Sequence, residues 1–171
     1  MEKHGVEIER KYIIMKPSVA DVSACDGYAA SEIEQIYLAS DEGVTRRIRK
    51  RVTDGTARYY LTEKRRIDRM SADEYEREIT SLEYCRLRTE MDPNTRPIYK
   101  TRHAFFVDTQ SFEIDIYPEW RSTAIMETEL ADRDTEVTMP DFIRVVREVT
   151  GVRGYSNAAM SRKFPDEEKI D

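Results

Sequence analysis

Charged side chains that recur at positions i and i+2 are the residues of this sequence best able to do chemistry. Side chains two positions apart in a β-strand lie on the same face of the sheet, so each pair would present two like charges together. Lys11 extends the first acidic pair, and Lys64 stands alone. The acidic pairs are Glu7/Glu9, Glu74/Glu76, Glu113/Asp115 and Glu127/Glu129, and the basic pairs are Arg47/Arg49 and Lys100/Arg102.

Two arrangements explain these charged pairs. In an ordinary sheet the charged face lies in water, which is a sufficient account of any single pair. Pairs of segregated sign on successive strands favour a barrel whose charged face lines the lumen. Such a lumen would be unstable when empty, because desolvated charge is costly unless it is paired or coordinated. A polyanion with a divalent metal ion supplies both counter-charges, so the pattern indicates metal-assisted phosphoryl transfer.

The segments that carry the pairs alternate apolar and charged residues with the period of two that is typical of strands. Gly43, the Asp54-Gly55 pair and residues 108–111 predict hairpin turns between successive strands. Eight antiparallel strands are enough to close a barrel. The predicted fold is α+β dominated by β-structure: a closed eight-stranded antiparallel β-barrel with a few flanking helices. The predicted strands lie near residues 5–14, 34–39, 44–52, 57–66, 72–79, 97–107, 111–117 and 124–130.

Helices are predicted in the connections. Thr80 and Glu83 form a capping box that opens a helix through about residue 91. A second helix is predicted from Pro140 to Gly151, where apolar residues recur with helical spacing. A third, short helix is predicted over residues 157–163.

Length and composition restrict the function. A chain of 171 residues is expected to be one tunnel domain over 1–171, with 166–171 as a loose tail. A net charge of −6 argues against a nucleic-acid binder or an anionic-membrane binder. Cys25 and Cys85 form neither a metal-ligand spacing nor a disulfide framework. With no apolar leader and no run of about 18 apolar residues, a cytoplasmic location is expected.

The ordered motifs resemble those of the CYTH superfamily, the triphosphate tunnel metalloenzymes, and especially its short bacterial inorganic triphosphatases. The segment from Val6 to Lys11 is similar to the superfamily's ExExK signature, which is weak by itself. The resemblance depends on the order of further elements along nearly the whole chain. These are Gln35-Ile36-Tyr37-Leu38, Arg47-Ile48-Arg49, Lys64, Glu74-Tyr75-Glu76, Lys100-Thr101-Arg102, Phe112-Glu113-Ile114-Asp115, Glu127-Thr128-Glu129, and Glu148-Val149-Thr150 followed by Tyr155 and Asn157.

The resemblance implies an eight-stranded tunnel, a small-molecule triphosphate substrate and Mg²⁺ or Mn²⁺ as cofactor. It implies that Lys11, Tyr37 and Glu9 are catalytic. It places Glu76, Glu113 and Asp115 in the tunnel without defined roles. The implied phosphate-binding residues are Arg47, Arg49, Lys64, Lys100 and Arg102, and the implied metal-holding or water-orienting residues are Glu7, Glu9, Glu127 and Glu129.

The sequence departs from the pattern of the short members in two places. Ala72 stands where those members usually carry arginine, and their Arg-Tyr-Lys-Asn element appears as Gly154-Tyr155-Ser156-Asn157, without its basic residues. We expect a metal-dependent triphosphatase, with inorganic tripolyphosphate hydrolysed to pyrophosphate and phosphate. A class IV adenylate cyclase or a thiamine triphosphatase is the alternative among enzymes. A non-catalytic polyphosphate or nucleotide sensor is the alternative of another class, and a homodimer is left open.

Overall fold

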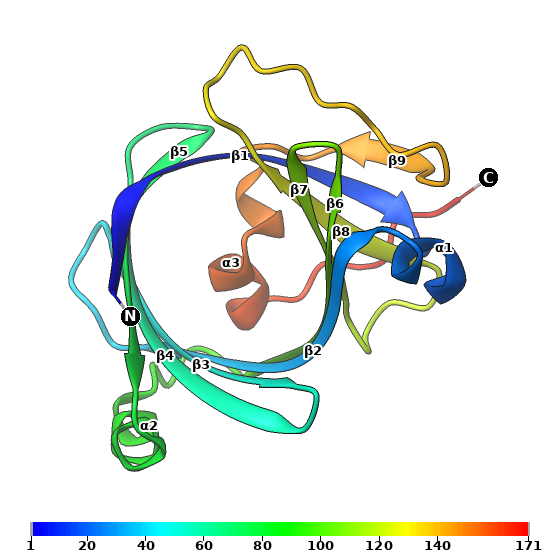
Figure 1. Ribbon diagram of the computed structural model, residues 1–171. Coiled ribbons are helices and arrows are strands. Elements are labelled where there is room, and N and C mark those ends of the chain that lie inside the picture. The colour runs from blue at the N-terminus through cyan, green and yellow to red at the C-terminus, as the bar shows by residue number, and fades with distance from the viewer. Residues whose placement is uncertain (1, 171) are drawn as a thin grey trace.

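Antiparallel strands form one nine-stranded sheet that closes on itself in the computed structural model, which describes residues 2–170 (Figure 1). Hairpins join β3 to β4 and β6 to β7 through Asp54 and Asp108, both of which have a positive φ. The strands are β1 (Glu2–Met15), β2 (Asp26–Leu38), β3 (Val44–Thr53), β4 (Thr56–Arg66), β5 (Ser71–Ile79), β6 (Ile98–Val107), β7 (Gln110–Ile116), β8 (Thr123–Glu129) and β9 (Val145–Glu148).

The first strand closes the barrel by changing its partner half-way along. From Glu2 to Ile8 it pairs with β5, and from Glu9 to Met15 it pairs with β8. The order β5-β4-β3-β2-β6-β7-β8-β1 is thereby joined into a ring. The added strand β9 pairs with the second half of β1, beyond the stretch that β5 covers. This confirms the predicted closed eight-stranded antiparallel barrel, with one extra strand.

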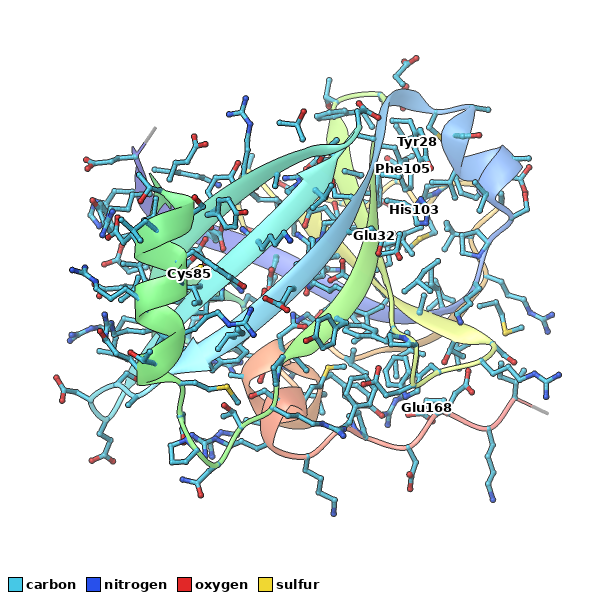
Figure 2. All side chains as sticks on the ribbon, turned by 90° about the horizontal axis from the view of Figure 1, so that it is seen from below. Tyr28, Glu32, Cys85, His103, Phe105 and Glu168 are labelled. Carbon is cyan, nitrogen blue, oxygen red and sulfur yellow. The ribbon has the colours of Figure 1, made fainter. Side chains whose placement is uncertain are left out.

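The apolar side chains of the strands pack on the outside of the barrel, under helices and loops. Helix α2 (Ser81–Leu87) covers a cluster that contains Ile36, Ile48 and Leu61. A second cluster contains Phe105 and Phe112 and packs with Val22 of helix α1 (Val19–Ser23). Figure 2 shows Phe105 and His103 on the side of β6 that faces α1. The alternate, charged side chains of the same strands are therefore left to the inside.

One end of the lumen is closed by apolar side chains. Met160 of helix α3 (Asn157–Arg162) packs with Ile98, Ile125 and Tyr117, which are all buried. In Figure 1, α3 lies within the outline of the ring, whereas α1 and α2 lie outside it. No helix within residues 2–170 is both long and apolar enough to cross a membrane.

The helix predictions had different outcomes. Thr80 accepts a hydrogen bond from the Glu83 amide at 3.1 Å, which confirms the capping box, although α2 ends at Leu87 and continues as a 3₁₀ turn, η1 (Arg88–Glu90). Helix α3 confirms the third predicted helix. Helix α1 was not predicted; its signal is Ser18, which accepts a hydrogen bond from the Asp21 amide.

The predicted helix from Pro140 to Gly151 is wrong. Residues Val145–Glu148 form β9, and Val145 is 41% exposed. The second half of β1 has an edge that β5 does not cover, so a strand gains ladder hydrogen bonds there. The β-branched residues Val145 and Val146 also fit a strand better than a helix.

Of the segment 166–171 that was expected to be a loose tail, residues 166–170 form no helix or strand, but they are tied to the barrel. The Glu167 carboxylate accepts hydrogen bonds from the amides of Arg121, Ser122 and Thr123 at 2.9, 2.5 and 2.7 Å. Glu168, which Figure 2 labels on this segment, accepts a hydrogen bond from the Tyr155 hydroxyl at 2.8 Å. Sequence alone gave no reason to expect these contacts, because the amides that Glu167 binds are distant in the chain.

Replacing Glu167 by alanine should lower the free energy of unfolding by about 1–3 kcal/mol, since a charged acceptor of several hydrogen bonds is lost. Burial alone would raise the pKa of Glu167, but the three amides lower it to about 2. Its contribution is therefore present above the usual carboxyl pKa and is lost as pH falls through about 2. Urea unfolding at several pH values measures this, with Asp166→Ala as the exposed control; equal losses for both variants would contradict the anchoring role.

Candidate active site

Ion pairs between strands that are not neighbours place the charged side chains on the concave side of the barrel. Lys64 of β4 contacts Glu7 of β1 at 3.1 Å, reaching over β5. Arg49 of β3 contacts Glu76 of β5 at 2.8 Å, reaching over β4. The structure thus brings the predicted residues of opposite strands together in one lumen. By strand parity and these contacts the lumen also contains Glu9, Lys11, Tyr37, Arg47, Lys100, Arg102, Glu113, Asp115, Glu127 and Glu129.

Lys11 of β1 and Glu127 of β8 form a close ion pair in the lumen. Their charged atoms are 2.7 Å apart, and the Lys11 ammonium also lies 3.9 Å from Glu9. Burial would lower the pKa of Lys11, but Glu127 and Glu9 raise it above its usual value. Burial would raise the pKa of Glu127, but Lys11 and Arg102 help to lower it to about 2. Both partners are therefore charged at neutral pH.

The backbone around Lys11 is held by the segment that follows β9. The Lys11 amide donates to the Thr150 hydroxyl at 3.0 Å, and the Val149 amide donates to the Lys11 carbonyl at 2.8 Å. The Lys11 ammonium donates to the Tyr155 carbonyl at 3.5 Å. This part of the chain therefore fixes the position of Lys11 in the wall of the lumen.

Glu9 and Glu129 form an acidic strip beside that pair. They are opposite each other in the ladder between β1 and β8, and Glu129 is 53% exposed at its side chain. The pKa of Glu9 is raised by burial and by the neighbouring charges of Glu127 and Glu7. Within residues 2–170, no group of three His, Cys, Asp or Glu side chains is placed to hold a metal ion.

The strip nevertheless fits a divalent cation. Carboxylate oxygens are the ligands that Mg²⁺ prefers, and Mg²⁺ is usually held by one or two carboxylates, with substrate phosphates and water as the other ligands. Burial, and after it the like charge of Glu127, raises the pKa of Glu9, so the ionised carboxylate is favoured by any added positive charge. A bound cation would supply it.

A basic wall lies on β3 and β4, formed by Arg47, Arg49 and Lys64. Arg47 is 3.7 Å from Glu74, and Lys64 is 3.3 Å from the same carboxylate. The Nε atoms of Arg47 and Arg49 are buried and have no hydrogen-bond partner among the described residues. Each guanidinium therefore keeps donor capacity that an anion in the lumen can use.

Lys100 and Arg102 are instead engaged by one carboxylate, Asp115. Arg102 donates two hydrogen bonds to it at 2.7 and 2.8 Å, and Lys100 donates a third at 2.5 Å. The remaining donors of Arg102 contact Glu113 and Glu127. The side chains of Lys100 and Asp115 are each 1% exposed. These two basic residues therefore hold Asp115 in this structure and have less free donor capacity than the basic wall.

Burial sets the protonation of this cluster. It lowers the pKa of Lys100 to about 8, even though the attraction of Asp115 works in the opposite direction. Burial would raise the pKa of Asp115, but Arg102 and Lys100 bring it well below its usual range. Asp115 thus remains ionised throughout the neutral range.

Tyr37 lies buried against Gln35. The Gln35 amide donates to the Tyr37 hydroxyl at 2.8 Å, and burial raises the pKa of Tyr37, so the phenol remains protonated. Of the positions that depart from the pattern of the short members, Ala72 is opposite Glu7 in the β1–β5 ladder, and Ser156 caps α3 by accepting a hydrogen bond from the Ala159 amide.

Sequence reasoning left three lumen residues out of the candidate site. Glu74 lies between Arg47 and Lys64, and Thr62 donates a hydrogen bond to Glu76. Arg51 continues the row of Arg47 and Arg49 along β3, and it donates to the Ser31 hydroxyl at 2.9 Å. The period of two that identified the charged pairs also marks Glu74 and Arg51, whereas no charge pattern marks Thr62.

Comparisons with known proteins bear on the fold. No family model and no curated protein matches the sequence. The solved structure of the inorganic triphosphatase NE1496 matches with a TM-score of 0.59 and 25% identity, over 93% of this chain and 96% of that chain. The PH1819 protein of Pyrococcus horikoshii OT3 matches with a TM-score of 0.55 and 21% identity, over 75% and 80% of the two chains.

A more distant match shows the fold alone. A putative adenylate cyclase from Vibrio parahaemolyticus has a TM-score of 0.50 and 10% identity, over 74% of this chain and 78% of that chain. Together these matches confirm the structural resemblance to CYTH-like proteins that the ordered motifs indicate.

Replacing Asp115 by asparagine should lower the free energy of unfolding by about 3–5 kcal/mol, because Lys100 and Arg102 would be left buried without their shared counter-charge. Glu113→Gln is the matched control, since Glu113 lies two positions away on the same face and its side chain is 39% exposed. Urea unfolding of the two variants without ligand at pH 7 compares their free energies of unfolding. Equal values would show that the buried contacts of Asp115 with Lys100 and Arg102 stabilise the fold no more than the exposed Glu113 does.

Proposed function

We propose that this chain, which shares the CYTH-like fold, is a metal-dependent triphosphatase that hydrolyses inorganic tripolyphosphate to pyrophosphate and phosphate. The observation that carries the proposal is the division of the lumen into two charged surfaces. The basic wall of Arg47, Arg49 and Lys64 retains unused donors, and the strip places the carboxylates of Glu9 and Glu129 opposite each other in the β1–β8 ladder. The match to the inorganic triphosphatase NE1496 agrees with this substrate class.

The basic wall binds and orients the phosphate chain. Guanidinium groups bind phosphate oxygens through directed, charge-assisted hydrogen bonds, so Arg47 and Arg49 fix the chain in one orientation. Lys64 adds a charge that neutralises the phosphates. Lys100 and Arg102 lie deeper in the lumen, where they bind Asp115. They contribute positive charge, and any donor that leaves a carboxylate when phosphate binds can form a hydrogen bond to the phosphate instead. Holding the phosphate chain in line with the attacking water raises the reaction rate, because the entropy of alignment is lost on binding and not in the chemical step.

Glu7, Glu9, Glu127 and Glu129 are the residues that would hold a divalent cation or orient the attacking water. A cation bound there would neutralise phosphate charge. We assign to Glu9, which lies in the lumen 3.9 Å from Lys11, the role of orienting the attacking water and taking its proton. The water oxygen then forms a bond to the terminal phosphorus as the bridging P–O bond breaks.

Lys11 and Tyr37 act on the charge that develops during this step. Lys11 remains protonated because its pKa is raised, so it stabilises the negative charge that accumulates on phosphate oxygens. Tyr37 also remains protonated and donates a neutral hydrogen bond. The protein needs no covalent intermediate for this reaction.

Product analysis with tripolyphosphate, ATP and thiamine triphosphate, each with Mg²⁺ and with Mn²⁺, tests the proposal. Tripolyphosphate should be consumed with the highest kcat/KM and should yield orthophosphate and pyrophosphate. A cyclase would bring the ribose 3′-hydroxyl to the α-phosphorus and release pyrophosphate and cyclic AMP from ATP. Cyclic AMP as the main product would overturn the hydrolase proposal. Tight binding of tripolyphosphate without phosphate release under any of these conditions would favour a sensor.

Glu9→Gln should reduce kcat by roughly a hundredfold or more, because it removes a metal ligand and the proton acceptor for water. The variant should remain folded with equal or slightly higher stability at pH 7, since the wild-type charge is disfavoured by burial and by Glu127. Steady-state kinetics and thermal unfolding measure both effects. Glu63→Gln, on the outer face of β4, is the control. Full activity of Glu9→Gln at saturating Mg²⁺ would remove Glu9 from the site.

A further inference from the structure

Glu76 is a lumen carboxylate whose contacts are unlike those of the acidic strip. It lies on β5, opposite Thr62 in the ladder with β4. The Arg49 guanidinium and the Thr62 hydroxyl both donate to the same oxygen of Glu76, at 2.8 Å each. Thr62 is completely buried. Glu76 is therefore held in place on the side of the basic wall, where phosphate is proposed to bind.

The contact with Arg49 is incomplete. Only one terminal nitrogen of the guanidinium donates to Glu76, whereas a structural Arg–carboxylate pair is often bidentate, as between Arg102 and Asp115. The Nε atom of Arg49 is buried and has no hydrogen-bond partner within residues 2–170. Such an unsatisfied donor is costly, so Glu76 leaves Arg49 short of its full set of bonds.

The neighbouring charges also act on the pKa values of Arg49 and Glu76. Burial and the neighbouring Arg47 lower the pKa of Arg49, although Glu76 opposes this. Burial would raise the pKa of Glu76, but Arg49 and the Thr62 hydroxyl lower it. Glu76 is thus kept ionised beside Arg49, whose guanidinium is charged at neutral pH in any case. A phosphate group has more acceptor oxygens than a carboxylate, so it could accept hydrogen bonds from both the Nε atom and the terminal nitrogen of Arg49.

We infer that Glu76 is an internal counter-ion that competes with phosphate for Arg49 and is displaced when a phosphate group binds. The inference rests on the proposed function, because it assigns a role to Glu76 at the same phosphate site. Glu76 stabilises the empty lumen and weakens the binding of substrate and products alike. Weaker binding of both raises KM without assisting chemistry, but it also releases product faster.

Binding of pyrophosphate, measured by isothermal titration calorimetry at pH 7 with Mg²⁺, tests the competition directly and requires no turnover. Glu76→Gln should bind pyrophosphate about tenfold to a hundredfold more tightly than the wild type, because Arg49 no longer gives up a charged hydrogen bond. In tripolyphosphate hydrolysis the same variant should have a KM and a product inhibition constant lowered by a similar factor.

Glu78→Gln is the matched control. Glu78 is the next residue of the same parity on β5, it is exposed, and it pairs only loosely with Arg58 at 3.6 Å. Its substitution removes the same charge from the same strand and should leave pyrophosphate affinity at the wild-type value. Equal tightening in both variants would show a general effect of net charge and would overturn the inference.

Other outcomes also separate the inference from the proposed function. Unchanged or weaker pyrophosphate binding by Glu76→Gln would overturn the inference about Glu76 but would not contradict the proposed hydrolase function. Tighter binding by Glu76→Gln, with no turnover of tripolyphosphate by the wild type, would support the inference and overturn the hydrolase. If Glu76→Gln does not fold, Glu76→Asp replaces it, since the shorter side chain weakens the contact with Arg49 and should give a smaller gain in affinity; no gain would overturn the inference.

Discussion

Buried charges of both signs can share one closed lumen only if each lies against a counter-charge. Desolvation of an isolated carboxylate or ammonium costs far more than a small domain can offset, so the barrel depends on its internal ion pairs. The cluster of Lys100, Arg102 and Asp115 satisfies this constraint most completely, with three short hydrogen bonds to one carboxylate. The pairs of Lys11 with Glu127 and of Lys64 with Glu7 satisfy it nearer to the candidate reaction centre.

The closure of the barrel determines which charges meet. Because β1 pairs first with β5 and then with β8, Glu7 lies near the basic residue of β4, whereas Lys11 lies opposite Glu127 of β8. A shift of one residue in either ladder would turn the charged side chains to the outside and the apolar ones to the lumen. The apolar clusters under α1 and α2 prevent such a shift. Packing on the outside of the barrel thus fixes the chemistry inside it.

The sequence predicted which residues lie in the lumen better than it predicted which of them form ion pairs with one another. A period of two along each strand is a local property, so the shared face of Lys100 and Arg102, or of Glu113 and Asp115, follows from it. The partner of Lys64 depends on the curvature and closure of the whole sheet, which local spacing does not encode. For the same reason the segment at Val145 was predicted as a helix, since the available edge of β1 that makes it a strand is a tertiary feature.

Stability and ligand binding use the same charged groups in this barrel, and this makes them compete. A phosphate chain that takes Arg47 or Lys64 must release Glu74, and the released carboxylate then needs another partner. A divalent cation on the acidic strip or a proton can provide part of that compensation, so anion binding is coupled thermodynamically to cation or proton binding. The sequence pattern requires an anion for the basic residues and a cation for the acidic ones, and the binding of the two is therefore linked in the folded protein. Binding of either one makes the binding free energy of the other more favourable.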